Sequence, residues 1–403
     1  MTDYFIQLRF LIVRLYNLNM LSRTLETTLK RQAAFFPVVA VTGPRQSGKT
    51  TLVRNVFAGK PYVSLEDPGE RAFAQEDPRG FLARFKSGAI FDEAQRWPEL
   101  FSYLQGMVDE DRSPGRFVLT GSQQFGLLSG ITQSLAGRVG MNTLLPLGYA
   151  EIPTVQSQAL SLDDLMLRGG YPELHTSQVP TRDWMASYVA TYLERDVRQV
   201  LNVQDLSVFA RFLRLCAGRT AQLLKISSLA DEAGVSQSTA RAWLSVLEAS
   251  HVVQLLQPYH RNFGKRLVKT PKLYFLDTGL ACWLLGIYRA EQLATHPARG
   301  ALFETWVLAE ALKSRYHAGL PNDLYFWRDN NGVEADLMFE TPQGLQTVEI
   351  KSGQTVTQDS IRAGLRSKRM AGDEALTPWL IHGGADNYER GGVRVMGWRA
   401  MEL

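Results

Sequence analysis

The stretch VVAVT-GPRQSGKT-TLVRNVF, residues 38–57, decides the fold of this 403-residue chain. A run of mostly β-branched residues is followed by a glycine loop and then by a segment with helical periodicity. Gly43, Gly48, Lys49 and Thr50 occupy every fixed position of the pattern G-x-x-x-x-G-K-[ST]. Glycine lets backbone N–H groups curl around an anion, and the following helix points its positive end at the same place. The sequence therefore predicts a strand, a phosphate-binding loop and a helix.

Each position of this loop has an expected role in binding ATP. Lys49 is expected to reach the β- and γ-phosphates, and the Thr50 hydroxyl is expected to ligate Mg²⁺. ATP and Mg²⁺ are thus the expected cofactors. The expected nucleotide-binding residues are Gly43, Pro44, Arg45, Gln46, Ser47, Gly48, Lys49, Thr50 and Thr51.

A second acidic motif follows the short apolar run AIF, residues 89–91, in the form of Asp92 and Glu93. Asp92 is expected at the end of a strand, where it would complete the Mg²⁺ shell with Thr50. Glu93 is expected to orient and activate the attacking water.

Two further motifs bear on the transferred phosphate. RFVLTGSQQF, residues 116–125, predicts a strand whose Thr120 and Ser122 contact the γ-phosphate; a plain polar turn is the alternative. SLAGRVG, residues 134–140, contains Arg138, a candidate for stabilising charge on the phosphoryl group. Arg138 would act in its own chain or, in a homo-oligomer, on a neighbouring subunit, and a plain structural arginine is the alternative.

The composition indicates a folded protein, with 45% hydrophobic and 21% charged residues. The only two cysteines, Cys216 and Cys282, exclude a disulfide scaffold and are expected to be buried thiols. The apolar segment at residues 5–20 is interrupted by Arg9 and Arg14, which predicts no membrane span and a cytoplasmic location. The net charge of +4 is compatible with nucleic acid but does not establish it.

Residues 226–256 have the spacing of a helix-turn-helix, with the turn at Ala233-Gly234-Val235 and Ser236 capping the second helix. A hairpin is expected next, and its stretch 260–272 holds five basic residues (Lys or Arg) and no acid. The pattern predicts a winged helix with a basic wing. Contact with nucleic-acid phosphates and docking of a protein partner are the two alternatives for this surface.

The last part of the chain carries carboxylates in a pattern typical of metal-dependent nucleases. A two-residue turn at 342–343 would place Asp336 opposite Glu349 on neighbouring strands, with Lys351 on the same face and Glu304 supplied by a helix. This set resembles PD-(D/E)xK nucleases and predicts a second metal site. A three-residue turn would move Glu349 to the other face, and an inactive, structural form of the fold is the rival interpretation.

The order of motifs resembles that of bacterial and archaeal AAA-type ATP-binding proteins with a carboxy-terminal domain of unknown function 4143. Besides the loop and the acidic strand, the motifs that carry the resemblance are RTLE (23–26), SLAGRV (134–139), LPLGYAEI (145–152), RGGYPE (168–173) and TYLERDV (191–197). The resemblance implies an ATP-binding core followed by a winged helix.

We therefore expect an α/β protein with a P-loop NTPase parallel-sheet core of the AAA type, a winged-helix domain and a PD-(D/E)xK nuclease-like α/β domain. The expected parts are an extension at 1–19, the ATPase core at 20–155, a helical linker and winged helix at 156–290, and the nuclease-like domain at 291–403. The expected function is a Mg²⁺-dependent ATPase that acts on a partner or nucleic acid. A nucleotide-gated interaction switch with little hydrolysis and an ATP-regulated DNA nuclease are the alternatives.

Overall fold

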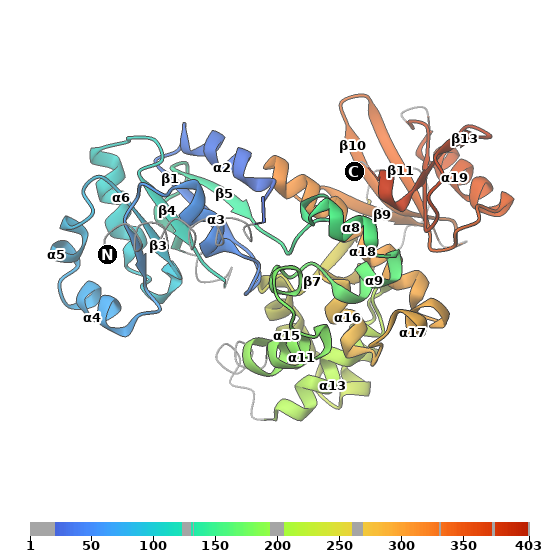
Figure 1. Ribbon diagram of the computed structural model, residues 1–403, viewed down its shortest axis with the longest axis horizontal. Helices are drawn as coiled ribbons and strands as arrows, with labels where there is room; N and C mark the ends of the chain where they lie inside the picture. Colours follow the sequence, from blue (N-terminus) through green and yellow to red (C-terminus); the bar gives the residue numbers. More distant parts are fainter. Residues whose placement is uncertain are drawn as a thin grey trace, which may run out of the picture.

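The structure is a computed structural model that describes residues 21–122, 130–131, 133–193, 205–259, 269–329, 332–372 and 375–401. Three parts follow one another along the chain (Figure 1). We call them the N-terminal lobe (21–143), the middle segment (154–295) and the tail (299–401).

The N-terminal lobe is a parallel sheet covered by helices on both faces. Its strands, in the spatial order β2-β3-β4-β1-β5, span Tyr62–Ser64, Ala89–Asp92, Phe117–Thr120, Val38–Thr42 and Val139–Thr143. Its helices α2 to α6 span Leu25–Ala33, Lys49–Val56, Pro68–Glu76, Pro78–Ala83 and Leu100–Glu110.

Successive residues of β1 point to opposite faces of this sheet, and both faces are buried. Val39 and Val41 join a core with α2 and α3, whereas Val38 and Ala40 join the core on the α5 and α6 side. All five residues of β1 are therefore apolar or small, as the continuous run in the sequence requires.

The middle segment is mainly helical. Helices α8 to α11 span Thr154–Ala159, Leu162–Arg168, Glu173–Thr176 and Thr181–Tyr188; α13 to α17 span Leu206–Ala217, Ile226–Ala233, Gln237–Ala249, Thr278–Leu284 and Ala290–Thr295. The expected helix pair is present as α14 and α15, joined through Gly234 with a φ of 74°. As predicted, Ser236 caps α15 by accepting a hydrogen bond from the Thr239 N–H, at 3.1 Å.

Three strands of the middle segment form an antiparallel set in the order β6-β8-β7, spanning Gln222–Leu223, Lys272–Phe275 and Val253–Pro258. The last residues of β7 pair in parallel with β9 of the tail, at Gln257 with Tyr325 and Pro258 with Phe326. Among the described residues one nine-stranded sheet therefore runs from the middle segment into the tail, in the order β13-β14-β12-β11-β10-β9-β7-β8-β6.

The tail adds strands β9 to β14 and two long helices. The strands span Leu324–Arg328, Glu334–Thr341, Gly344–Lys351, Trp379–His382, Tyr388–Arg390 and Val393–Gly397; α18 spans Arg299–Ala318 and α19 spans Gln358–Ala371. One hydrophobic cluster extends from Leu145 to Trp398 and includes residues of both the middle segment and the tail. A single hydrophobic cluster thus crosses the boundary expected between residues 290 and 291.

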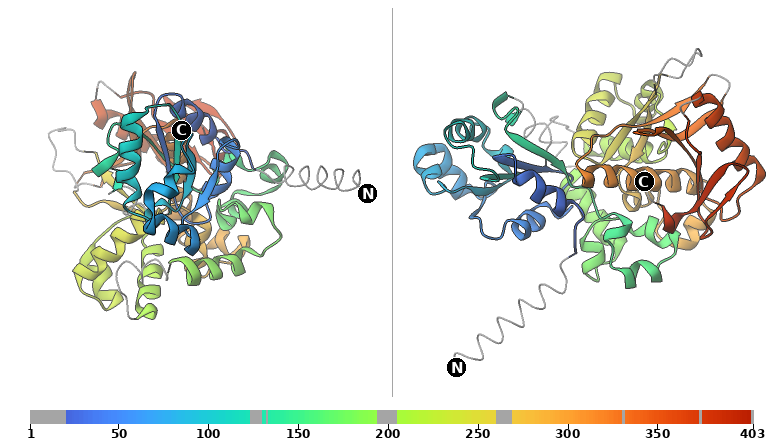
Figure 2. Two further views of the ribbon diagram at one scale, coloured as in Figure 1. Left: turned by 90° about the vertical axis from the view of Figure 1, so that its left-hand side faces the viewer. Right: turned by 90° about the horizontal axis from the view of Figure 1, so that it is seen from above.

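Helix α18 connects the parts in space. It contacts β11 in the tail, α16 in the middle segment, and α2 and β5 in the N-terminal lobe. Seen from above, this orange helix extends from the N-terminal lobe toward the tail sheet (Figure 2). Within the described ranges no helix is long and apolar enough to cross a membrane. Both cysteines are buried, as expected, and burial raises the pKa of the Cys216 thiol to about 12.

Candidate functional site

The phosphate loop, residues 43–48, joins the end of β1 to the start of α3. Gly43 and Gly48 adopt positive φ angles of 144° and 90°. A Cβ atom on Gly43 would collide with the carbonyl oxygen of Leu144, so this position accepts only glycine. Gln46 also has a positive φ, of 63°, which tightens the same curl of the backbone. The predicted strand, loop and helix are present.

Lys49 lies in the first turn of α3 with its side chain directed back into the loop. It is buried, and its Nζ donates hydrogen bonds to the carbonyls of Gly43 at 3.0 Å and Pro44 at 2.7 Å. Thr50 and Thr51 follow it in the helix, and Pro44, Arg45, Gln46 and Ser47 form the loop itself. The expected nucleotide-binding residues therefore form one continuous loop and helix end.

Asp92 is the meeting point of three hydroxyl groups. Thr50 Oγ1 donates to Asp92 Oδ2 at 3.0 Å and the Tyr62 hydroxyl donates to the same oxygen at 2.7 Å. Thr120 Oγ1 donates to Oδ1. Burial and the hydrogen bond to Asp92 raise the pKa of Tyr62 above its usual value, so the phenol stays a donor. Thr120, expected to contact a phosphate, holds the acidic side chain in this structure, and its phosphate contact stays a prediction.

Glu93 lies at the end of β3 with a φ of 53°, a conformation that costs a non-glycine residue about 1 kcal/mol. Gln95 Nε2 donates to its Oε2 at 2.5 Å, and Ser122 Oγ donates to the same oxygen at 3.1 Å. The structure thus brings Glu93 and Ser122 together at the end of the sheet where the phosphate loop lies. The backbone and two donors fix the direction of the Glu93 carboxylate.

Arg138 is not part of this arrangement within one chain. Its carbonyl accepts the N–H of Val38 at the start of β1, so the five residues of β1, about 16 Å of strand, separate it from the phosphate loop. Its guanidinium forms a bidentate ion pair with Asp109, in which Nε lies 2.7 Å from Oδ1 and Nη2 lies 2.9 Å from Oδ2. Direct action of Arg138 on the nucleotide of its own chain is therefore excluded by the fold.

Three residues near the phosphate loop were not predicted to have a role. Tyr62 holds Asp92, and Arg23 of the RTLE motif donates to the Ser47 carbonyl at 2.7 Å. His251, in the turn between α15 and β7, is buried, and its Nε2 has no hydrogen-bond partner among the residues that the structure describes. Burial and then the positive charge of Lys49 lower the pKa of His251 to about 4. Of these three residues, only Arg23 belongs to a sequence motif named above, RTLE.

In the tail, β10 and β11 have the register of the two-residue turn. Thr341 pairs with Gly344 and Leu337 with Val348, which brings Asp336 and Glu349 to facing positions. Asp336 Oδ2 accepts the N–H of Ile350 at 2.8 Å. Lys351 Nζ lies 2.6 Å from Glu349 Oε1 and 3.7 Å from Asp336 Oδ2.

Glu304 of α18 faces the same cluster, but Lys272 of β8 lies between the carboxylates. Lys272 Nζ is 2.9 Å from Glu304 Oε1 and 2.5 Å from Glu334 Oε1. Burial and then the negative charge of Asp336 raise the pKa values of Glu304 and Glu349 to about 7. Burial alone would lower the pKa of Lys272, but the charges of Glu304, Asp336 and Glu334 raise it.

The residues of the predicted metal site, Glu304, Asp336, Glu349 and Lys351, therefore gather in one cluster, and Lys272 and Glu334 join it. In the described part of the chain, no three His, Cys, Asp or Glu side chains gather in the arrangement of a metal site. Two ammonium groups, of Lys272 and Lys351, lie among the carboxylates of this cluster. Lys272 belongs to the basic stretch 260–272, so this member points inward rather than to a surface. Residues 260–268 of that stretch lie outside the described residues.

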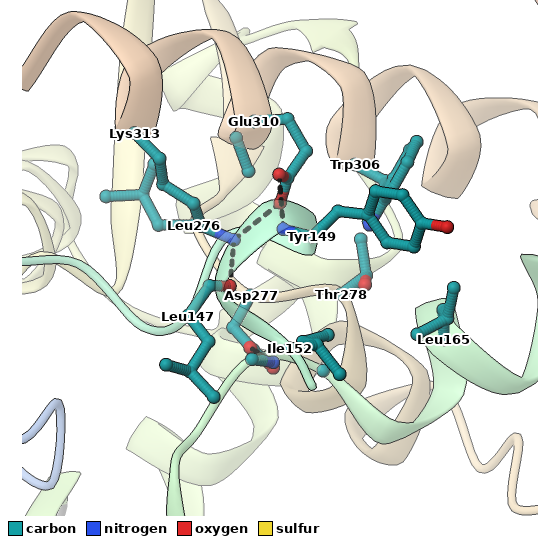
Figure 3. A pocket seen from close by; sticks show the side chains of 13 residues that line it. Leu147, Tyr149, Ile152, Leu165, Leu276, Asp277, Thr278, Trp306, Glu310 and Lys313 are labelled. Atoms are coloured by element: carbon teal, nitrogen blue, oxygen red, sulfur yellow. Dashed lines mark hydrogen bonds and ion pairs between the residues drawn. The ribbon is translucent and has the colours of Figure 1, made fainter. Parts of the chain in front are cut away.

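The segment 147–151, which leaves the N-terminal lobe, is bound to the middle of α18 (Figure 3). Glu310 accepts the N–H of Tyr149 at 2.7 Å, and Lys313 donates to the Leu147 carbonyl at 2.9 Å and pairs with Glu310 at 2.8 Å. The cavity beside them holds only about 20 Å³, the space of a single water. This contact joins the lobe to α18 and is too small for a ligand.

Family models match the three parts in order. Residues 36–153 match a model described as an AAA domain, residues 159–291 a domain of unknown function (DUF8612), and residues 299–401 another domain of unknown function (DUF4143). Together with the phosphate loop and the acidic strand ends, the first match defines an AAA-type P-loop ATPase-like domain.

The chain belongs to the same family as the uncharacterized proteins Rv2008c of Mycobacterium tuberculosis and Mb2031c of Mycobacterium bovis. Each is 37% identical over 345 residues, which cover 84% of this chain and 75% of the relative. Among solved structures, similarity extends to the Walker-type ATPase PABY2304 of Pyrococcus abyssi, with 15% identity, 64% of this chain, 94% of that chain and a TM-score of 0.43. DnaA of Aquifex aeolicus has 11% identity, 56% and 85% coverage and a TM-score of 0.29. Both likenesses are too distant to indicate a function.

Proposed function

We propose that this protein is a Mg²⁺-dependent ATPase that couples ATP binding and hydrolysis to a partner through its middle segment and tail. The observation that carries the proposal is the 3.0 Å contact between Thr50 Oγ1 and Asp92 Oδ2, directly after the phosphate loop. Hydroxyl and carboxylate oxygens of this kind are the ligands that Mg²⁺ prefers in proteins.

Each residue of the site has a proposed role that follows from its position. Lys49 and the loop N–H groups would bind the phosphates, and Thr50 and Asp92 would hold Mg²⁺. Bound Mg²⁺ neutralises charge on the phosphate oxygens. Glu93 would accept a proton from the attacking water, because Gln95 and Ser122 fix its carboxylate at the same strand ends.

The test is ATP turnover and nucleotide binding by the purified chain, with Mg²⁺ and with EDTA. We expect Lys49→Ala to abolish binding and Glu93→Gln to bind ATP but hydrolyse it at least about a hundredfold more slowly, as loss of a general base does. Lys60→Ala is the matched control, since Lys60 lies in the same lobe and donates to the Arg116 carbonyl at the opposite end of the sheet. Wild-type turnover that is unchanged in Lys49→Ala would refute the proposal.

Two outcomes separate the proposal from its rival, a nucleotide-gated switch. Mg²⁺-dependent turnover that falls in Glu93→Gln supports an ATPase. Tight binding without turnover in the wild type would identify the switch.

The partner-binding unit is proposed to be the winged helix made by α13, the α14–α15 pair and the strands β6-β8-β7. What supports this assignment is the order of helices and strands and the turn at Gly234. Retention on immobilised double-stranded DNA at 50 and 200 mM salt would test the nucleic-acid alternative, because phosphate contacts weaken steeply with salt. Retention at neither concentration would leave protein docking as the assigned role.

A further inference from the structure

A buried guanidinium lies directly behind the phosphate loop. Arg23, just before α2, donates through Nη1 to the Ser47 carbonyl and through Nη2 to the Leu145 carbonyl, each at 2.7 Å. The same Nη1 lies 3.6 Å from the point where a Cβ on Gly48 would be. Only 5% of the Arg23 side chain is exposed.

The Ser47 carbonyl is a group through which a side chain from outside the loop can fix the conformation of the loop. A loop that turns its N–H groups toward an anion turns its carbonyls away from it, and these carbonyls need partners of their own. Ser47 directly precedes Gly48, the first residue before α3. A donor on the Ser47 carbonyl therefore fixes both the last part of the loop and the start of the helix.

The second carbonyl held by Arg23 belongs to the segment that follows β5. Gly43, at the other end of the loop, packs against Leu144 of this segment. The loop is thus held against residues 144–145 at both ends, by close packing at Gly43 and by the Arg23 guanidinium at Ser47. A planar guanidinium suits this task because its two outer nitrogens reach two acceptors in a fixed geometry.

We propose that Arg23 is a positioning residue of the ATP site: it fixes the phosphate loop through the Ser47 carbonyl and ties it to the Leu145 carbonyl of the neighbouring segment. This inference rests on the proposed function. It gives a role to the RTLE motif, for which the sequence offered none.

Glu151 of the LPLGYAEI motif anchors Arg23 in turn. Its Oε1 is 3.1 Å from Arg23 Nε, as an ion pair without a well-aligned hydrogen bond, and only 2% of the Glu151 side chain is exposed. The N–H groups of Gly148 and Thr24 donate to the same carboxylate at 2.9 and 2.7 Å. His317, near the end of α18, approaches it to 3.7 Å. The two motifs therefore meet in one buried pair between the phosphate loop and α18.

The competing interpretation is that Arg23 only stabilises the fold. Arg116 offers a matched control in the same lobe. Its guanidinium is also largely buried, donates to the carbonyls of Lys86 and Met107 at 2.9 and 2.7 Å, and pairs with Asp111 at 3.4 Å. It precedes β4 and so lies at the end of the sheet away from the phosphate loop.

The experiment measures the Kd for ATP and for ADP, and the melting temperature, of the full chain as Arg23→Gln, Arg23→Lys, Arg116→Gln and Lys49→Ala. We expect Arg23→Gln to raise both Kd values about tenfold, the loss of one charge-assisted hydrogen bond. Arg116→Gln should lower the melting temperature but change both Kd values less than about twofold, since it touches no part of the loop. Arg23→Lys keeps the charge but offers one donor nitrogen in place of the two that reach the Ser47 and Leu145 carbonyls, so it should recover part of the affinity.

Equal Kd values for Arg23→Gln, Arg116→Gln and the wild type would overturn the role of Arg23, while loss of binding in Lys49→Ala would leave the ATP site standing. Binding that is absent in the wild type would refute the proposed function instead. Should Arg23→Gln fail to fold, Arg23→Lys provides the test, because it keeps Glu151 paired. An ATP affinity of Arg23→Lys equal to that of the wild type would then contradict a role for the hydrogen bonds from Arg23 to the two carbonyls.

Discussion

Lys272 on β8 and Glu304 on α18 form an ion pair of 2.9 Å at the junction between the middle segment and the tail. Only 4% of the Lys272 side chain is exposed, and its ammonium also pairs with Glu334. A cation supplied by the protein thus lies beside Glu304, one of the carboxylates of the nuclease-like pattern in the sequence.

Replacing Lys272 with Met should destabilise the fold by about 3 kcal/mol, because breaking one side of a buried ion pair leaves carboxylates uncompensated. The expected loss of stability lies at the low end of the range that is usual for breaking a buried ion pair, because Glu304, whose pKa is already raised to about 7, can take up a proton. Urea unfolding at pH 7.5 measures it. Lys269→Met is the control, because this nearby lysine is exposed and its loss should change stability by less than about 0.5 kcal/mol. Equal stability of the two variants would contradict the cluster.

The wild type should not nick DNA in a metal-dependent manner. Lys272 and Lys351 already pair with carboxylates of the cluster and would compete with a divalent cation for them. Plasmid and single-stranded DNA with Mg²⁺ or Mn²⁺ provide the assay, with Asp336→Ala beside the wild type. Nicking that needs the metal and disappears in Asp336→Ala would show that the tail is a nuclease after all.

His251 should make the folded state sensitive to acid. Its pKa of about 4 in the folded chain lies below the ordinary 6.5, so the unfolded chain takes up a proton between pH 6.5 and 4 while the folded chain does not. Stability that is present above pH 6.5 is therefore lost as the pH falls through this window, by about 3 kcal/mol. His251→Asn, which tolerates the positive φ of 52° and stays neutral, should lose less stability than the wild type on going from pH 7.5 to 4.5. If His251→Asn and the wild type lose the same amount of stability between pH 7.5 and pH 4.5, this role of His251 is ruled out.

Arg138→Ala should bind ATP with a Kd within about twofold of the wild type, because Arg138 lies at the far end of β1 and pairs with the exposed Asp109. Its effect on turnover then distinguishes two cases. Lower turnover that is restored by mixing Arg138→Ala with Lys49→Ala chains assigns the guanidinium to a neighbouring subunit. Unchanged turnover makes it a structural arginine, and weaker ATP binding would contradict its position at the far end of β1.

The phosphate loop could be predicted because its requirements are local. Gly43 and Gly48 are needed for backbone angles and close packing, and Lys49 and Thr50 follow within two residues. The register of β10 and β11 could also be predicted, since a two-residue turn fixes every later pair of the hairpin. By contrast, no local pattern shows that the Thr120 hydroxyl binds Asp92, because these residues meet only when β3 and β4 pair.

The sequence by itself determined the phosphate loop, its acidic strand end, the helix pair at 226–249 and the facing positions of Asp336 and Glu349. Only the tertiary structure placed Arg138 away from the loop, Arg23 behind it, and Lys272 among the carboxylates of the tail. The reason is physical. Backbone angles, helix caps and turns depend on residues that are neighbours in the sequence, whereas buried charged side chains pair with residues that are distant in the sequence. Arg23 and Glu151 are 128 residues apart, and Lys272 and Glu304 come from a strand and a helix of different parts.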